Sequence, residues 1–323
     1  MNRVRANLSG YYAQWLDLRR SAANRSYGLK WKVVGGRRYL YEVFDRNGNG
    51  RSLGPESPEL QARYEKFNAD RANFKLDLEA ITKTLAETAQ LYAALNLPML
   101  DANAAEIFRE ADVAGMLGTQ LLAVGTNAMA AYEMEAGGRF LIGFDATADC
   151  DLAFRGTVTT FTAAAGRQLD QTLLGLLKRL DSTYTINQER SFQARNRKGF
   201  EIELLAAPSV LPKLPAGELV PVENLIEQEW LLLGRPVDQV VLGLDRKPAR
   251  IVCPDPRWMA LHKSWLAMQP KRRADKRKKD EEQGRRLFSA IRTHMPHYPF
   301  DGVFTASLPG VLQPIYSALV AQG

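Results

Sequence analysis

Two aspartates, Asp149 and Asp151, begin a short apolar run and are spaced as neighbours on one face of a β-strand. Two carboxylates held side by side repel each other, and a divalent cation relieves that repulsion. Carboxylate oxygens suit Mg²⁺, which also binds substrate phosphates. A pair of such ions stabilises the attacking and leaving oxygens of an in-line displacement. Taken alone, the pair is explained at least as well by an ordinary turn.

A candidate phosphate site lies upstream, where the apolar run 121–124 ends in Gly125, Thr126 and Asn127 and a helix is expected to begin. Glycine lets the backbone approach a ligand closely, and the first N–H groups of a helix attract phosphate. Tight strand-to-helix turns often contain glycine for structural reasons, so this motif depends on its neighbours for support.

A third carboxylate is expected from another strand, and residues 200–205 offer Glu201 and Glu203 on one face of an alternating pattern. Without the other motifs, the plainer interpretation is a half-buried edge strand with two solvated glutamates. The pattern itself does not choose between the two glutamates.

Several segments, in chain order, resemble the DNA polymerase β-like nucleotidyltransferase superfamily. The closest likeness is to its bacterial branch, which has a GTNA helix and a T-x-D-x-D strand. The matching segments are Tyr39-Leu40-Tyr41, Ser52-Leu53-Gly54-Pro55, Gly125-Thr126-Asn127-Ala128, Tyr132-Glu133, Ala136-Gly137, Thr147-Ala148-Asp149-Cys150-Asp151, the runs 176–182 and 199–205, Pro254-Asp255-Pro256-Arg257 and Ala260-Leu261-His262-Lys263. The resemblance implies an α+β fold with a mixed-sheet core, and transfer of a nucleoside monophosphate from an NTP to an acceptor.

The resemblance also implies roles for single residues. Asp149, Asp151 and Glu203 would be the catalytic carboxylates and would bind Mg²⁺ or Mn²⁺. Gly125, Thr126 and Asn127 would bind the triphosphate of the NTP. The superfamily usually has aspartate where this chain has Glu203, and the extra methylene puts the position of the base in question.

Lys263 is a further candidate for NTP binding, although a lysine on a helix surface is usually just solvated. For His262, packing against Trp258 or Trp265 and catalysis are equally good interpretations. The acceptor stays open between an RNA end, a protein and a small molecule.

The elements that must position these residues follow from periodicity. Residues 1–100 are expected to form an N-terminal β-hairpin and a long helix, with β structure up to about residue 57, strands at 29–34 and 38–44, and a helix from Ser57 to Pro98. Residues 101–253 alternate between strands and helices and are expected to form the core. Within the core, strands are predicted at 140–144 and 150–154. Residues 254–323 are expected to be helical.

The excess positive charge is concentrated between Lys271 and Arg286, which carries +5 of the net charge of +7. This run has almost no apolar residues, so it is predicted to be an exposed helix that contacts nucleic acid. A solvated surface helix is the alternative. Interleaved basic and aromatic residues at 30–41 fit either a nucleic-acid surface or a small structural sheet.

Composition limits the remaining classes of function. No apolar run is long enough for a membrane helix, and two isolated cysteines give no disulfide framework, so a cytoplasmic protein is expected. Residues 45–56 match the letters of a calcium-binding EF-hand loop, but a predicted strand precedes them where that motif needs a helix. Two functions remain: an active nucleotidyltransferase, and an inactive protein of that fold that binds nucleic acid or a toxin–antitoxin partner.

Overall fold

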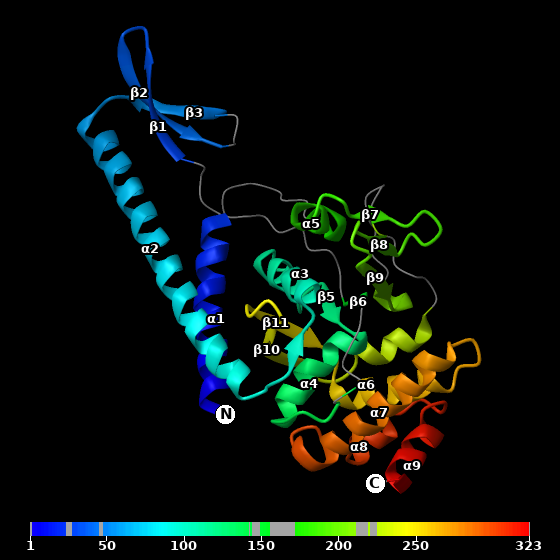
Figure 1. Ribbon diagram of the computed structural model, residues 1–323. Helices are drawn as coiled ribbons and strands as arrows, with labels where there is room; N and C mark the ends of the chain where they lie inside the picture. The colour runs from blue at the N-terminus through cyan, green and yellow to red at the C-terminus, as the bar shows by residue number, and fades with distance from the viewer. Residues whose placement is uncertain are drawn as a thin grey trace. The chain divides into compact units, whose positions relative to one another are not determined.

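The computed structural model describes residues 2–23, 28–44, 48–141, 143, 149–155, 172–210, 219 and 225–322. The protein has the expected α+β fold and divides into two compact units (Figure 1). One, here called the N-terminal unit, contains Gly10–Glu87. The other, the larger unit, contains Met1–Ser9, Thr88–Thr159 and Asp170–Gly323.

The N-terminal unit contains the predicted hairpin. Strand β1 (Gly28–Val34) pairs antiparallel with β2 (Arg37–Val43), and Gly35 and Gly36 form the turn with positive φ angles. The predicted long helix is α2 (Pro58–Ala94), and the hydroxyl of Ser57 caps it by accepting a hydrogen bond from the N–H of Leu60.

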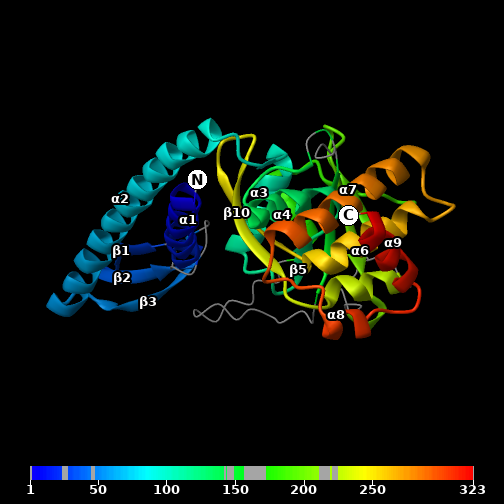
Figure 2. The same ribbon diagram turned by 90° about the horizontal axis from the view of Figure 1, so that it is seen from below.

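The prediction of β structure from the N-terminus onward is wrong for the first residues, which form helix α1 (Asn2–Ala23). Leu8, Tyr12 and Leu16 recur every four residues and are buried, so they form an apolar stripe along α1. Abundant charged and polar residues around this stripe obscure its period in the sequence. Figures 1 and 2 show the later part of α1 beside α2.

A strand precedes the EF-hand pattern, and another strand lies within it. Its first residues, 45–47, lie outside the described part of the chain, but β2 precedes them and β3 (Gly50–Pro55) follows. Strand β3 pairs antiparallel with β2 and completes a three-stranded sheet that the sequence had suggested only as a hairpin. An EF-hand needs a helix before its loop and no strand within it, so β2 and β3 are inconsistent with that motif.

The larger unit is built on a five-stranded sheet with strand order β5-β6-β9-β8-β7. Among the described strands of this sheet, β6 and β9 pair in parallel, and the other strand pairs are antiparallel. The strands are β5 (Leu121–Ala123), β6 (Asp149–Phe154), β7 (Thr185–Ile186), β8 (Gln193–Arg195) and β9 (Glu201–Ala206).

A second sheet of the larger unit has the order β11-β10-β4, with β4 (Met99–Leu100), β10 (Val237–Gly243) and β11 (Pro248–Cys253). The helices are α3 (Ala102–Val113), α4 (Met129–Ala136), α5 (Leu173–Leu180), α6 (Pro256–Ala267), α7 (Ala274–His294), α8 (Gly302–Ala306) and α9 (Gln313–Gln322). Short 3-10 turns occur at Gly125–Ala128, Pro208–Val210 and Ile226–Leu232. The helical C-terminal part expected from Pro256 onward therefore comprises α6 to α9.

A predicted strand at 140–144 is not found at its described residues, Phe140, Leu141 and Gly143. The N–H groups of Phe140 and Leu141 donate instead to the carboxylate of Glu133, at 2.7 and 2.8 Å. Glu133 lies on α4 and is buried, so a side chain satisfies the backbone groups that a strand neighbour would otherwise pair.

Among the described residues, no helix is both long enough and apolar enough to span a bilayer. Cys150 and Cys253 are buried and form no disulfide. Both cysteines therefore belong to the core packing of the two sheets.

Candidate active site

The parallel pairing of β6 with β9 brings the predicted carboxylates together. In the strand register Asp149 lies opposite Glu201, and Asp151 lies opposite Glu203. Cys150 lies between the two aspartates of β6, and Ile202 lies between the two glutamates of β9. Both are completely buried on the other face of the sheet. Since strand residues alternate in direction, all four carboxylates project from the same face of the sheet.

Gly125 gives Asp151 the space that it occupies. The φ angle of Gly125 is +64°, and a Cβ atom there would lie only 2.1 Å from Oδ2 of Asp151. The backbone of the preceding residue also holds the turn close to β6, because the N–H of Val124 donates to the carbonyl of Asp151 at 3.0 Å. The glycine is therefore required for its left-handed backbone and for its missing side chain.

The residues after Gly125 connect this turn to other elements. The side-chain amide of Asn127 donates to the carbonyl of Asp149 at 2.9 Å, which ties the turn to the start of β6. The hydroxyl of Thr126 accepts from Nε2 of Gln283 at 3.4 Å. The predicted helix begins with a 3-10 turn, Gly125–Ala128, and α4 continues it.

Gln193 on β8 orients both glutamates of β9. Its side-chain N–H₂ group donates to Glu201 at 3.1 Å and to Glu203 at 3.0 Å. Glu201 also lies 3.6 Å from the guanidinium of the exposed Arg195. Glu203 lies directly beside Asp151 and helps to raise its pKa, whereas Glu201 lies directly beside Asp149.

The carboxylates perturb one another's protonation. Burial is the main cause that raises the pKa of Asp151 to about 7, although part of its side chain still meets solvent. Asp149 and Glu203 raise this pKa as well, while Lys263 and Lys276 oppose them. Burial, followed by Asp149, also raises the pKa of Glu203. Such a concentration of negative charge favours a bound cation.

Helix α7 supplies cations to this face. Nζ of Lys276 lies 3.6 Å from Oδ2 of Asp149. One turn further, Lys279 is partly buried, and burial is the main cause that lowers its pKa, while Asp149 acts to raise it. Gln283, which donates to Thr126, lies on the next turn. The three side chains are spaced by three and four residues, so they share the face of α7 that is turned toward the carboxylates.

The prediction that the whole run from Lys271 to Arg286 is exposed is therefore wrong for one face. Gly284 allows the contact with α6, because a Cβ there would lie 2.9 Å from the backbone oxygen of Ala260. Arg277 and Lys278 stay exposed on the outer face. The helix has few apolar residues in this stretch, but small and paired polar groups allow its inner face to pack.

Lys263 is not on the helix surface. It is buried, and its ammonium lies 2.8 Å from Asp280 on α7. Arg272 donates to the other oxygen of Asp280, also at 2.8 Å. Burial pushes the pKa of Asp280 upward, but Lys263 and Arg272 outweigh it and hold this pKa below its ordinary value. The ion pair of Lys263 and Asp280 joins α6 to α7, one turn beyond Lys276.

His262 packs between aromatic rings. Its ring centroid lies 6.3 Å from that of Trp230 and 6.5 Å from that of Trp265. Within the described chain neither of its ring nitrogens has a hydrogen-bond partner. Burial lowers the pKa of His262 to about 3, so the ring is neutral. The structure favours packing over catalysis for this residue. Its ring contacts are Trp265, as predicted, and Trp230, where Trp258 had been the predicted alternative.

Four residues of this arrangement, Gln193, Lys276, Lys279 and Gln283, were not single candidates from the sequence. For the α7 residues a signal was present. Continuing the apolar stripe of Leu287 and Ile291 backward at helical spacing leads to Gln283, Gly284 and Lys276. No comparable signal marks Gln193, whose role depends on the pairing of β8 with β9.

In a comparison with protein families, a family model described as a nucleotidyltransferase matches residues 102–307. Comparisons with curated proteins and with solved structures gave no significant match. The matched range begins at α3 and ends beyond α8, so it includes all the carboxylates, the Gly125 turn and α7. The chain belongs to this nucleotidyltransferase family.

Proposed function

We propose that this member of the nucleotidyltransferase family is a metal-dependent enzyme that transfers NMP from an NTP to an acceptor. Asp149, Asp151 and Glu203 would hold Mg²⁺ or Mn²⁺. The observation that supports this most strongly is the parallel register of β6 and β9, which sets Asp151 directly beside Glu203. Together with the Gly125 turn, it favours the DNA polymerase β-like branch that the sequence motifs resemble.

The donor set fits a hard divalent cation, because it consists of carboxylate oxygens on one face of two neighbouring strands. Within the described residues, no three acidic, histidine or cysteine side chains already form a group that encloses an ion. Asp149 faces Lys276, and Glu203 accepts from Gln193, so both carboxylates have other partners. Metal binding would require these contacts to loosen as the carboxylates converge.

A divalent cation bound there would neutralise phosphate charge and align the attacking and leaving oxygens of the displacement. The turn at Gly125, Thr126 and Asn127 would receive the triphosphate through its backbone N–H groups. Lys276 would move from Asp149 to a phosphate oxygen as the metal takes its place at the carboxylate. Lys279 lies on the same face of α7 and would add a second positive charge.

Lys263 has a different proposed role from the direct phosphate contact predicted from the sequence. Its ammonium is held by Asp280 in a buried pair that positions α7 against α6. Through that pair Lys263 would keep Lys276 over the carboxylates. It also lowers the pKa of Asp151 through its positive charge, so it acts on the site without reaching the NTP.

The test begins with nucleotide binding. Titrating the protein with each NTP, with Mg²⁺ or with EDTA, should give binding that depends on the metal. Asp149→Ala and Asp151→Ala should abolish it while thermal unfolding stays cooperative. If both variants bind Mg²⁺ and NTP as the wild type does, the proposed site is wrong.

The acceptor is then found by labelling. Incubation with α-³²P-NTPs, Mg²⁺ or Mn²⁺ and a cell extract should transfer label to an RNA end, a protein or a small molecule. Binding without transfer in any extract, combined with metal-independent binding of nucleic acid, would favour the inactive binding protein instead.

A further inference from the structure

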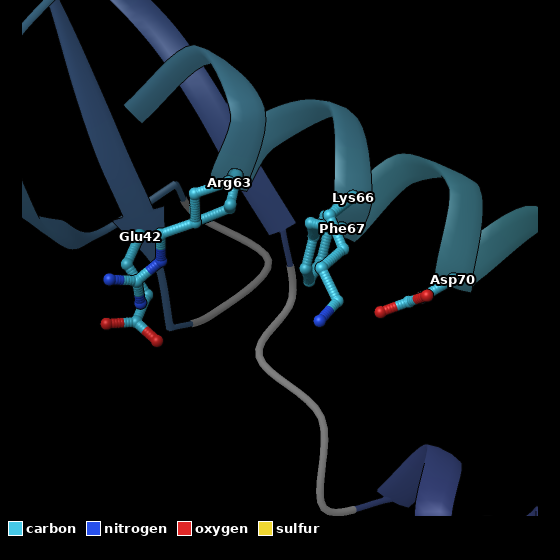
Figure 3. A pocket seen from close by; sticks show the side chains of 6 residues that line it. Glu42, Arg63, Lys66, Phe67 and Asp70 are labelled. Atoms are coloured by element: carbon cyan, nitrogen blue, oxygen red, sulfur yellow. The ribbon is translucent and has the colours of Figure 1, made fainter. Parts of the chain in front are cut away.

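The three-stranded sheet of the N-terminal unit has one face covered by α2. Leu29, Trp31 and Glu42 point to this face, and the rings of Trp31 and Tyr64 of α2 lie 6.0 Å apart. A pocket between the sheet and α2 is lined by Leu29, Glu42, Arg63, Lys66, Phe67 and Asp70 (Figure 3). Figure 3 shows Arg63 extending from α2 alongside Glu42 of β2.

Two acidic residues pair with arginines of the covered face. Glu42 pairs with Arg51 at 2.9 Å, and the guanidinium of Arg38 pairs with Glu56. Arg38 also lies over the ring of Trp31, 4.9 Å from its centroid. On this face the two arginines Arg38 and Arg51 therefore already have protein partners.

The opposite face differs in its chemistry. The strand register places Lys30 opposite Tyr41, Lys32 opposite Tyr39, and Val34 opposite Arg37. The two lysines and the arginine are exposed, both tyrosines are partly exposed, and Val34 is 52% exposed. The β3 residues that pair with the two tyrosines, Ser52 and Pro55, are uncharged. Among the described strand residues, this face therefore carries no carboxylate.

Gly28 and Val43 pair at one end of this face, and both are buried, so that end is not accessible to a ligand. What remains open is the surface of Lys30, Lys32, Arg37, Tyr39 and Tyr41, here called the tyrosine–lysine face. Tyr39 and Tyr41 are two residues apart on the central strand, so they share this face and their Cα atoms lie about 7 Å from each other. Nζ of Lys32 lies 4.7 Å from the centroid of Tyr41, so the two groups are close enough to act on one ligand.

We propose that the tyrosine–lysine face binds single-stranded nucleic acid, with bases stacked on Tyr39 and Tyr41 and phosphates paired with Lys30, Lys32 and Arg37. Aromatic rings on a sheet accept any base, because every base has a π-face. Cations beside the rings neutralise the backbone phosphates. A duplex hides its bases from such a surface, so the face selects single strands. The proposal concerns the N-terminal unit alone and does not rest on the proposed enzyme activity.

The test measures fluorescence anisotropy of labelled oligo(U), oligo(dT) and a duplex with the full-length protein. EDTA is present and NTP is absent, so nucleotide transfer plays no part. Single strands should bind better than the duplex, and affinity should fall between about 50 and 200 mM salt. Lys30→Gln/Lys32→Gln should reduce the slope of log affinity against log salt by about 1.4, which is the release of counterions at two phosphates of a single strand.

The stacking contribution is tested separately. Tyr41→Ala should weaken binding by about 5- to 150-fold, the range for losing one stacked base, whereas Tyr41→Phe should keep the affinity. Arg51→Gln removes an exposed charge from the covered face and should leave binding unchanged. Circular dichroism checks the fold of each variant, and the two-lysine variant decides the matter if Tyr41→Ala is unfolded.

Several outcomes would overturn the proposal. One is no binding at low salt, and another is equal binding of single strands and duplex. A third is an equal loss in Arg51→Gln and in the two-lysine variant. Loss of binding in Arg277→Gln/Lys278→Gln alone would move the nucleic-acid site to the outer face of α7. Binding to anionic lipid vesicles without binding to the oligonucleotides would show a membrane surface instead.

Discussion

The ammonium of Lys276 on α7 lies 3.6 Å from the carboxylate of Asp149 at the start of β6. This contact joins the basic helix to the acidic sheet, two segments that the sequence presents as separate features. In the proposed enzyme the same lysine has two partners, Asp149 before metal binds and a phosphate oxygen afterwards. Its replacement is therefore expected to affect metal and nucleotide in opposite directions.

Lys276→Gln should tighten the binding of Mg²⁺ alone, because Asp149 loses its positive neighbour, and should weaken NTP binding by about tenfold, or ~1.4 kcal/mol. Calorimetric titration of each ligand separates the two effects. Arg277→Gln, next to it but on the exposed outer face, is the matched control and should change neither. Weaker binding of both ligands would indicate general damage to the site and contradict the exchange of partners.

The sequence predicted the parts of the site that depend on local patterns. Asp149 and Asp151 are two residues apart on a strand, and Gly125 ends the preceding one, so each motif is visible in a short segment. The choice of Glu203 over Glu201 required the resemblance, since alternation gives both residues the same face. The pairing of β6 with β9 is consistent with that choice, because it sets Glu203 beside Asp151.

The contributions of α7 and β8 were beyond such local patterns. Lys276 approaches Asp149 only because α7 packs on α6, and that packing depends on Gly284 and on the buried pair of Lys263 and Asp280. Counting charges along the segment predicted an exposed helix, because a charge that is paired looks the same in sequence as one that is solvated. Helical spacing separates the two faces better than composition does.

Gly125→Ala should disable the site. The new methyl group would collide with Asp151, and alanine at a positive φ angle costs about 1–2 kcal/mol in any case. Metal-dependent NTP binding should be lost, and the midpoint of thermal unfolding should fall. Gly138→Ala is the matched control, because a Cβ there has nothing within 4 Å and Gly138 has no positive φ angle. Wild-type NTP binding in Gly125→Ala would show that Asp151 need not approach this turn.

Glu203→Gln should reduce turnover far more than Glu201→Gln, by at least about tenfold. Both substitutions keep the size of the side chain and an oxygen that can accept from Gln193. Glu203 lies beside Asp151 and contributes to the raised pKa of that carboxyl, so its charge is the one expected at the metal. Initial rates of nucleotide transfer at saturating Mg²⁺ compare the two variants. Equal losses in both would leave the assignment of the third carboxylate without support.

Glu203→Asp introduces the residue that is usual at this position in the superfamily that the sequence motifs resemble. Aspartate is shorter by one methylene, so it draws the carboxylate back toward β9. If the site is adapted to glutamate, the variant should bind Mg²⁺ more weakly than wild type while keeping its charge. Tighter binding and faster transfer in Glu203→Asp would mean that the longer side chain limits this enzyme.

His262 should make the protein less stable in acid. Its pKa is about 3 in the folded protein and about 6.5 when unfolded. Between these two pH values His262 is protonated in the unfolded chain and neutral in the folded protein. The stabilising effect of the neutral ring is complete above pH 6.5 and is lost as the pH falls from there toward 3. Over that interval the free energy of unfolding should drop by up to about 1.4 kcal/mol per pH unit from this residue.

His262→Leu and His262→Gln should both remove that part of the acid sensitivity, because neither side chain titrates. They should differ at pH 7. Leucine also removes the two ring nitrogens that lack partners, whereas glutamine leaves a buried polar group, which costs about 1–3 kcal/mol when it is unpaired. Urea unfolding of the three proteins at pH 7 and at about pH 5 measures both effects. An unchanged loss of stability between the two pH values in both variants would assign the acid sensitivity to other groups, with the carboxylates around Asp151 the first to test.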